Sequence, residues 1–320
     1  MKKFLKILIK TISSNTVKNT NTPKINKPTL EEVPNINTKN KESDDLNLLI
    51  SLYKKNKISD DLNIKDFINK INPDATPNKC PYCNKINDFT ASRARKCPDC
   101  NNKMVVRQGV FLTESQAKQV EEMTQEFYKK QWIFSQISWT IESAQNHKVN
   151  KDQVNFLYNL AEAFKFMAQV CNQKNEKGLS FWDKSWGYYN KARVEDIKSS
   201  SKSEYGFTYT KLPEISWAMA KAILDQANSY NNDEIIKKWK VKSLRQAMVA
   251  LSEIAKYDND SYYKTDIYKF IKEITNELNI TSDELIKIKE DVSNSFKIEG
   301  STLEKYNNIV SELINYEVIN

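Results

Sequence analysis

Glycine and histidine are scarce in this sequence. Its 320 residues include 5 glycines and a single histidine, His147, whereas average usage gives glycine as ~7%, or roughly 22 residues. Each glycine stands alone, so neither G-x-G-x-x-G nor G-x-x-x-x-G-K-[ST] occurs. Both motifs need glycine, because a side chain would block the close approach of the backbone to phosphate. The scarcity argues against Rossmann and P-loop nucleotide sites. The single histidine argues against metallohydrolase sites built on two or three imidazoles.

Long apolar runs are also missing, since no stretch reaches the ~18 apolar residues that span a bilayer. The first twelve residues start with positive charge, but Lys6 and Lys10 interrupt the apolar stretch and no small-x-small cleavage site follows. We therefore expect a cytoplasmic protein, and an exported protein is the less favoured hypothesis. Residues 1–12 read as a frayed basic end or as a weak helix touching a membrane surface or a partner. The second reading rests on one shared apolar face: Phe4, Leu5, Leu8, Ile9 and Ile12.

The net charge of +8 is unevenly distributed. Residues 1–41 carry 9 Lys and 2 Glu, giving +7, and residues 78–108 carry 7 Lys or Arg and 2 Asp, giving +5. Residues 42–77 and 109–320 are slightly acidic, at −2 each. Composition and charge predict four parts: a basic, disordered tail and linker over 1–41, a short helical spacer over 42–77, a small module over 78–110, and an α-helical domain over 111–320.

The spacer contains a repeated segment, Ser-Asp-Asp-Leu-Asn, which starts at Ser43 and again at Ser59. A capping serine followed by acidic residues is typical of a helix start, and Pro73 and Pro77 stop a helix. The pattern predicts helices over residues 44–56 and 60–71.

Beyond residue 112 apolar residues recur at helical spacing, which predicts a mainly α fold, either a multi-helix bundle or a helical array. One seam repeats at intervals of 3 and 4, and three S/T-x-x-E/Q patterns predict capping boxes. Ser180 is predicted to open a helix, and residues 145–148 to connect two helices. The seam consists of Val154, Leu157, Ala161, Phe164, Ala168 and Cys171, and the capping boxes begin at Thr113, Thr281 and Ser301.

The strongest motif is a pair of Cys-x-x-Cys sequences, Cys80–Cys83 and Cys97–Cys100, separated by thirteen residues. Two thiolates at i and i+3 in a tight turn can point at one ion, and two such turns complete a tetrahedron. Residues 88–91 and 94–96 are predicted to form a hairpin, and residues 103–107 a third strand. The segment 80–107 resembles the four-cysteine zinc ribbons with a rubredoxin-like fold.

The resemblance implies one structural zinc ion held by Cys80, Cys83, Cys97 and Cys100, because four thiolates leave no open coordination position. Four-cysteine zinc ribbons often have glycine after each Cys-x-x-Cys unit, where this sequence has Asn84 and Asn101. Asparagine tolerates positive φ next best, so the fold remains compatible. Iron, disulfides and free thiols are the alternatives.

Basic residues surround the cysteines, and Tyr82 and Phe89 are available for stacking. Such a surface can follow a nucleic-acid backbone, or it can offset the −2 charge of a zinc ion held by four thiolates, or contact a protein. The candidate nucleic-acid contacts are Arg93, Arg95, Lys96, Lys103 and Arg107.

No catalytic constellation stands out, and we expect a protein that is not an enzyme. His147 lies in a polar segment, and no carboxylate pair has a useful spacing. The six tryptophans are core residues or line a groove for a partner segment. The sequence predicts an interaction or scaffolding protein acting through its helical domain. The alternative is a nucleic-acid-associated protein that contacts DNA or RNA phosphates through the ribbon and the tail.

Overall fold

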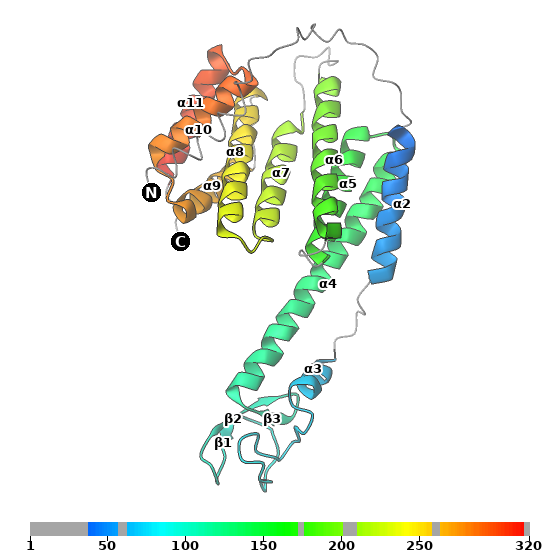
Figure 1. The fold of residues 1–320 in the computed structure, drawn as a ribbon, viewed down its shortest axis with the longest axis vertical. Coiled ribbons are helices and arrows are strands. Elements are labelled where there is room, and N and C mark those ends of the chain that lie inside the picture. Colours follow the sequence, from blue (N-terminus) through cyan, green and yellow to red (C-terminus); the bar gives the residue numbers. More distant parts are fainter. Residues whose placement is uncertain (1–37, 57–62, 172–175, 201–209, 258–262, 317–320) are drawn as a thin grey trace, which may run out of the picture. The chain divides into compact units, whose positions relative to one another are not determined.

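The protein is mainly α-helical with one small antiparallel sheet (Figure 1). The computed structural model describes residues 38–56, 63–171, 176–200, 210–257 and 263–316. The predicted tail up to residue 37, including the amphipathic residues 1–12, lies outside the described residues, and so does Ser59. Cα packing divides the chain into two units, Met1–Asp45 and Leu46–Asn320. Apart from the first residues of α2, the elements below belong to the second unit.

The described helices and strands follow one another in this order: α2 (Thr38–Asn56), α3 (Ile64–Ile71), β1 (Arg95–Lys96), β2 (Lys103–Arg107), β3 (Val110–Leu112), α4 (Glu114–Val149), α5 (Gln153–Val170), α6 (Glu176–Ser200), α7 (Leu212–Ala227), α8 (Asp233–Tyr257), α9 (Lys264–Leu278), α10 (Ser282–Phe296) and α11 (Gly300–Asn315).

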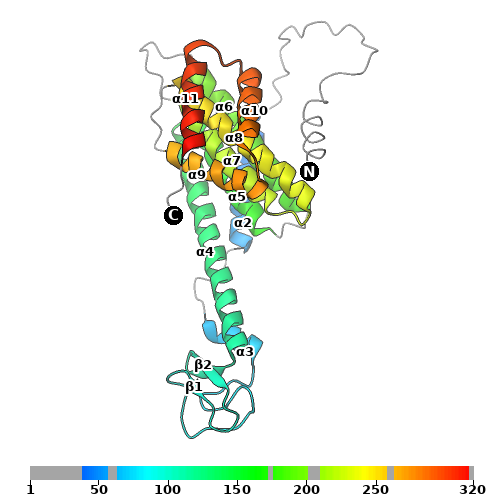
Figure 2. The same cartoon turned by 90° about the vertical axis from the view of Figure 1, so that its left-hand side faces the viewer.

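Two hydrophobic cores hold the helices together, and α7 contributes to both. The first core joins Leu46 and Leu49 of α2 to α4, α5, α6 and one face of α7. The second joins the other face of α7, through Trp217 and Ala220, to α8, α9, α10 and α11. Figure 2 shows α7 and α8 beside each other, with α9, α10 and α11 around α8. Neither core includes a residue of the cysteine-rich segment.

The predicted seam of α5 is confirmed. Leu157, Ala161, Phe164 and Ala168 are all buried in the first core, because residues spaced by three and four lie on one face of a helix. Val154 and Cys171, at the two ends of the seam, are only half-buried and pack against the same core. Cys171 follows the helix as its C-cap.

Two of the three predicted capping boxes are confirmed. Thr113 and Thr281 each accept a hydrogen bond from the backbone N–H three residues on, and Gln116 and Glu284 return the second bond. The third prediction is wrong. The helix α11 already begins at Gly300 with Glu299 as its N-cap, so Ser301 lies inside its first turn. The helix therefore begins two residues before the predicted first helical residue, Thr302, and Gly300 has a φ of +58°, which glycine adopts freely.

Other helix starts also differ from the prediction. The helix α2 begins at Thr38, so Ser43 lies within it and does not precede its first turn, and residues 38–41 are helical rather than part of a linker. The helix α3 begins at Ile64, with Asn63 as an N-cap that accepts a hydrogen bond from the backbone of Lys65. Both predicted C-terminal ends, at residues 56 and 71, are confirmed. Asparagine caps as well as serine, so several polar residues compete for each start.

Two more helix boundaries differ from the prediction. The helix α4 continues to Val149, so residues 145–148 form its last turn and not a connection. The chain reverses at Lys151, whose φ is +58°. The helix α6 begins at Glu176, four residues before Ser180.

In the part of the chain that the structure describes, no helix combines the length and the apolar character needed to cross a bilayer.

Candidate metal centre

The two Cys-x-x-Cys segments fold into two turns with the same backbone hydrogen bonds. In the first turn the N–H of Cys80 donates to the carbonyl of Lys85 at 2.8 Å, and the N–H of Asn84 donates to the carbonyl of Cys80 at 3.0 Å. In the second turn the N–H of Cys97 donates to Asn102, and that of Asn101 donates to Cys97, both at 2.9 Å. The local sequence therefore builds the same turn twice.

Each turn contains an asparagine with a left-handed backbone. Asn84 has a φ of +63° and Asn101 a φ of +57°, as predicted from their positions after each cysteine pair. This conformation lets the chain turn back so that the N–H groups face inward. Asparagine reaches it at a lower energetic cost than most residues other than glycine.

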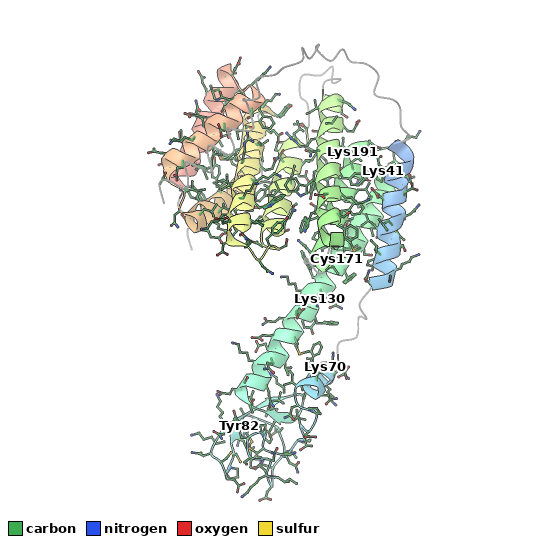
Figure 3. The ribbon with its side chains drawn as sticks, viewed as in Figure 1. Lys41, Lys70, Tyr82, Lys130, Cys171 and Lys191 are labelled. Carbon is green, nitrogen blue, oxygen red and sulfur yellow. The ribbon has the colours of Figure 1, made fainter. Side chains whose placement is uncertain are left out.

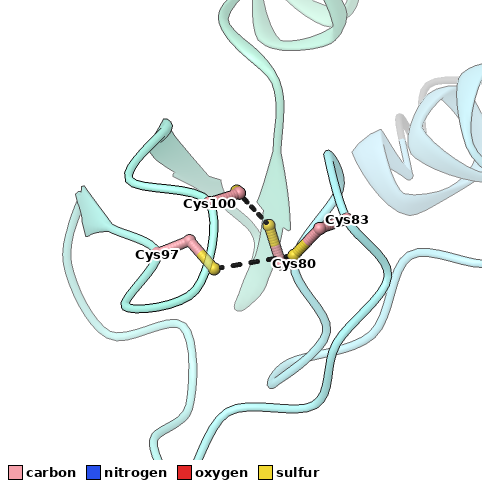
Figure 4. A group of neighbouring side chains, drawn as sticks. All are labelled: Cys80, Cys83, Cys97 and Cys100. Atoms are coloured by element: carbon pink, nitrogen blue, oxygen red, sulfur yellow. Dashed lines mark hydrogen bonds between the residues drawn. The ribbon is translucent and has the colours of Figure 1, made fainter.

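The four sulfur atoms gather in one place (Figure 4). The Cys80 and Cys100 Sγ atoms are 3.7 Å apart, and so are those of Cys83 and Cys97. All four Sγ atoms lie within 4.8 Å of one another. A tetrahedral site with metal–sulfur bonds of about 2.3 Å has sulfur–sulfur edges of about 3.8 Å, so these side chains fit a metal ion. They form no disulfide with one another.

The thiols differ in how readily they ionise. Burial raises the pKa of Cys80 to about 12, whereas a hydrogen bond from the backbone of Asn102 lowers the pKa of Cys100 to about 7. Cys80 and Cys97 are buried, and the other two cysteines are half-buried. A buried thiolate beside other thiolates is unfavourable unless a cation compensates the charge. A metal ion is such a cation, and it binds the deprotonated thiols.

A three-stranded sheet and an aromatic pair support the two turns. The order is β1-β2-β3, all antiparallel, with Arg95 opposite Met104 and Val106 opposite Phe111. The predicted strand at 103–107 is confirmed, whereas the predicted strand at 88–91 is absent from the described sheet. The third strand is instead Val110–Leu112, reached through a tight turn at residues 108 and 109, both with positive φ. The sheet therefore ends at Leu112, two residues beyond residue 110, the predicted end of the cysteine-containing module. We call this module, residues 78–112, the ribbon.

The core of the ribbon contains the metal-ligand candidates themselves. Cys80, Cys97, Met104 and Phe111 are buried together, and Phe89 packs edge-on against Phe111 with ring centroids 5.9 Å apart. Outside this core, the Lys85 ammonium pairs with the Asp99 carboxylate at 2.6 Å and so links the two turns. So small a core has few other apolar side chains, and a bound ion would contribute much of its stability.

A second small cluster joins the ribbon to the helices. Leu112 of β3 packs with Ala117 and Val120 of α4 and with Ile68 of α3. The helix α4 then continues into the first core through Ile137 and its neighbours. Because a 36-residue helix extends about 54 Å, one continuous element connects the ribbon to the helical domain.

The predicted nucleic-acid contacts do not form one uniform basic surface. Lys103 pairs with Glu114 at 2.9 Å, and Arg107 lies 3.8 Å from Glu121. Both carboxylates belong to the first turns of α4. The charge of +5 was counted over residues 78–108 and so did not include them. An acidic first turn is common in helices, and this signal could have revealed Glu114 as a partner. Glu121 lies about two turns into α4, so the same signal does not apply to it.

The remaining candidate contacts differ in exposure. Arg95 lies over the Phe89 ring, 4.1 Å from its centroid, so it covers one face of the ring that a base would otherwise stack on. Arg93 and Lys96 are exposed. Tyr82, labelled in Figure 3, is 40% exposed, and its hydroxyl accepts a hydrogen bond from the backbone N–H of Glu114.

Three aromatic side chains of α4 form an exposed stripe, which we call the α4 aromatic stripe: Tyr128, Trp132 and Trp139. They are 54%, 55% and 63% exposed. Their spacing of four and seven residues places them within about 40° of one another around the helix. Trp182 and Trp217 are buried, as expected for core tryptophans, while Trp186 and Trp239 are partly buried.

His147 lies in the last turn of α4, with its Nδ1 atom 3.2 Å from Oδ2 of Asp152, the N-cap of α5. This contact connects two consecutive helices.

Comparisons of the chain with protein-family models, with curated proteins and with solved structures found no match.

Proposed function

We propose that the protein is a non-enzymatic zinc-ribbon protein that acts in protein interaction or scaffolding through its helical domain. Two parts of this proposal have separate support. The cysteine cluster supports one structural metal ion, and the α4 aromatic stripe supports a protein partner.

Zinc is the metal that four thiolates in a closed tetrahedral arrangement favour. Cys80, Cys83, Cys97 and Cys100 would provide all four ligands, so the ion would stabilise the ribbon and bind no substrate. Elemental analysis of the purified protein should give about one zinc per chain. Cys97→Ser should lower this ratio. A protein purified with iron, whose thiolate complexes are coloured, would contradict the assignment.

The exposed tryptophans of α4 carry the proposal of a protein partner. Trp132 and Trp139 expose more than half of their surface, while the opposite face of the same helix is buried through Phe134 and Ile137. Tryptophan and tyrosine are enriched at the energetic centres of protein interfaces, where a partner removes their large apolar surface from water. The partner surface should therefore be apolar at its centre.

The matching experiment compares three forms of the full chain as bait in lysate of the source cells. Trp132→Ala/Trp139→Ala should retain a partner at least about 10-fold less than the unchanged protein. The control, Val194→Ala/Ile197→Ala, removes two half-exposed apolar side chains from α6 and should retain it fully. Equal retention by all three would remove the stripe from the interface. Failure of every form to retain a partner would contradict the scaffolding role.

The nucleic-acid alternative is favoured by one observation, the exposure of Arg93, Lys96 and Tyr82 in the cysteine-containing segment. It predicts binding to DNA or RNA of arbitrary sequence that weakens steeply with salt, because phosphate contacts release counterions. Arg93→Ala/Lys96→Ala should reduce this salt dependence, while Lys118→Ala, which removes a lysine of α4 paired with Glu122, should not. No retention on either polymer at ~50 mM salt would rule the alternative out.

A further inference from the structure

Two tryptophan side chains contact one ammonium group on the helical domain, and a tyrosine stacks on one of them. Trp186 lies on α6, Trp239 on α8 and Tyr230 in the connection before α8. The two indole rings are perpendicular, at 89°, with centroids 5.2 Å apart. Tyr230 stacks on Trp239 with centroids 5.9 Å apart. We call this arrangement the Trp186–Trp239 corner.

The ammonium group of Lys242 occupies this corner. Its Nζ atom is 4.2 Å from the centroid of Trp186 and 4.4 Å from that of Trp239. The other cation–ring contacts within the described residues each involve a single ring, for example Lys221 with Trp217. Attraction to the faces of two tryptophans, the ring type that binds cations most strongly, makes the corner a binding site for a positive charge.

The corner is reachable from solvent. Both tryptophans are only partly buried, and Lys242 is exposed. The Trp186 Nε1 atom, by contrast, is buried and has no hydrogen-bond partner in the protein. A buried indole N–H without a hydrogen-bond acceptor is unfavourable, so the Nε1–H group of Trp186 does not stabilise the fold. The part of Trp186 that can bind a cation is the face of its ring.

Lys242 is not an ideal occupant. Although the residue as a whole is exposed, partial burial of its ammonium group lowers its pKa, and the positive charge of Lys238 lowers that pKa further, while Asp183 acts in the opposite direction. A primary ammonium has three N–H donors that the rings cannot satisfy. A quaternary ammonium has none, and it keeps the attraction to both ring faces. Such a group can therefore replace Lys242, whose long side chain can move into solvent.

We propose that Trp186 and Trp239, with Tyr230 stacked on Trp239, form a binding site for a quaternary ammonium group, which Lys242 occupies when no ligand is bound. The carboxylate of Asp183 adds a negative charge near the site. The ligand is either a small molecule such as choline or a trimethylated lysine side chain, which share this chemistry. The site does not depend on the interaction role proposed for α4.

The test titrates the full chain with tetramethylammonium, choline and a peptide that contains trimethyllysine, followed by tryptophan fluorescence and calorimetry. Lys242→Ala should bind all three several-fold more tightly than the unchanged protein, because the competing ammonium is gone. Lys238→Ala is the matched control. It removes a neighbouring positive charge but leaves Lys242 between the rings, so its effect should be smaller.

Two further comparisons show whether the rings and the charge are responsible. Trp186→Ala should bind about 10-fold more weakly, as expected for a lost cation–π contact. Trp186→Phe keeps a ring face and should fall between. The neutral isostere of choline, 3,3-dimethylbutan-1-ol, should bind at least several-fold more weakly than choline. Far-UV circular dichroism of each variant confirms that it is folded.

Tighter binding of the peptide than of free choline supports a methylated protein as the source of the ligand, and the reverse supports a small molecule. The proposal is overturned if Lys242→Ala binds none of the three probes. It is also overturned if the neutral isostere binds as tightly as choline, if Lys238→Ala and Lys242→Ala have equal effects, or if the Trp186 variants bind normally.

Discussion

At the scale of single residues, the asparagines after each cysteine pair decide the shape of the ribbon. Asn84 and Asn101 hold positive φ and let the following backbone turn inward, so that Asn102 can donate to the thiol of Cys100. A residue with a Cβ and no special tolerance for this region must be forced into it, at a cost of roughly 1–2 kcal/mol.

Asn101 provides a direct test. Asn101→Ala should weaken metal binding by about 10-fold, because the turn that positions Cys97 and Cys100 becomes strained. Asn101→Gly should retain the affinity, since glycine adopts positive φ freely. Competition with a chromophoric chelator measures both variants. Equal affinities for the alanine and glycine variants would show that the backbone conformation at this position does not matter for the site.

A second residue-scale feature is a charge deep in the helical domain. The Glu253 carboxylate of α8 is buried and pairs with the Arg193 guanidinium of α6 at 2.5 Å. Burial raises the pKa of Glu253, and the charge of Arg193 offsets this only in part. The folded protein therefore holds a proton on Glu253 at a pH where the unfolded chain has lost it.

This raised pKa gives a prediction for pH dependence. Because the folded state binds the proton more tightly, the contribution of Glu253 to stability decreases as pH rises above its ordinary pKa of about 4.3. The stability of the unchanged protein relative to Glu253→Gln should therefore fall with rising pH in urea unfolding. Glu126→Gln is the control with the opposite sign, since Lys130 lowers the pKa of that exposed carboxyl. A constant difference across pH would contradict the prediction.

At the scale of elements, identical sequence patterns have different roles at different helix starts. Thr113 caps α4 through two reciprocal hydrogen bonds with Gln116, of 3.1 and 3.0 Å. Ser301 has the same pattern with Glu304 but lies inside α11, which begins one residue earlier. Thr113 also ends the sheet, since it follows directly after β3. Its cap therefore fixes the direction in which α4 leaves the ribbon.

Alanine substitution separates the two cases. Thr113→Ala should lower the free energy of unfolding by about 1 kcal/mol, because the backbone N–H of Gln116 loses the hydroxyl that accepts its hydrogen bond. Ser301→Ala should change it by less than about 0.5 kcal/mol, as is usual for an exposed residue without a cap. Denaturant unfolding followed by circular dichroism measures both. A larger loss for Ser301→Ala would mean that α11 starts differently from the observed structure.

At the scale of the whole molecule, the ribbon and the helices have separate cores. The cores formed by α2 and α4–α11 contain none of the four clustered cysteines, and the core of the ribbon contains all of them. The clustered residues of β3, α3 and the start of α4 connect these parts. Each core can therefore respond on its own to a change in conditions.

Metal removal tests this independence. A strong chelator should unfold the ribbon, because its few apolar side chains cannot hold four cysteines together without an ion. Far-UV helicity should largely persist, with loss limited to α3 and the first turns of α4, which hydrogen exchange can locate. Adding zinc back should restore protection at β2 and β3. A ribbon that stays protected without metal, or a general loss of helicity, would contradict the separation.

Much of the fold follows from local sequence patterns. Helical periodicity correctly predicted the seam of α5, and the Cys-x-x-Cys spacing correctly brought Cys80, Cys83, Cys97 and Cys100 together. Helix starts were less predictable, as with Ser43 and Ser301, because several polar residues compete for each cap and packing selects one of them.

The sequence by itself determined where thiols can meet, because both turns close within six residues and need only cysteine and asparagine at fixed positions. Only the tertiary structure decided which charges are paired and which aromatic rings are exposed. Glu121 reaches Arg107, and Trp186 meets Trp239, across separate elements. The physical reason is distance along the chain, since such contacts exist only after the helices have packed.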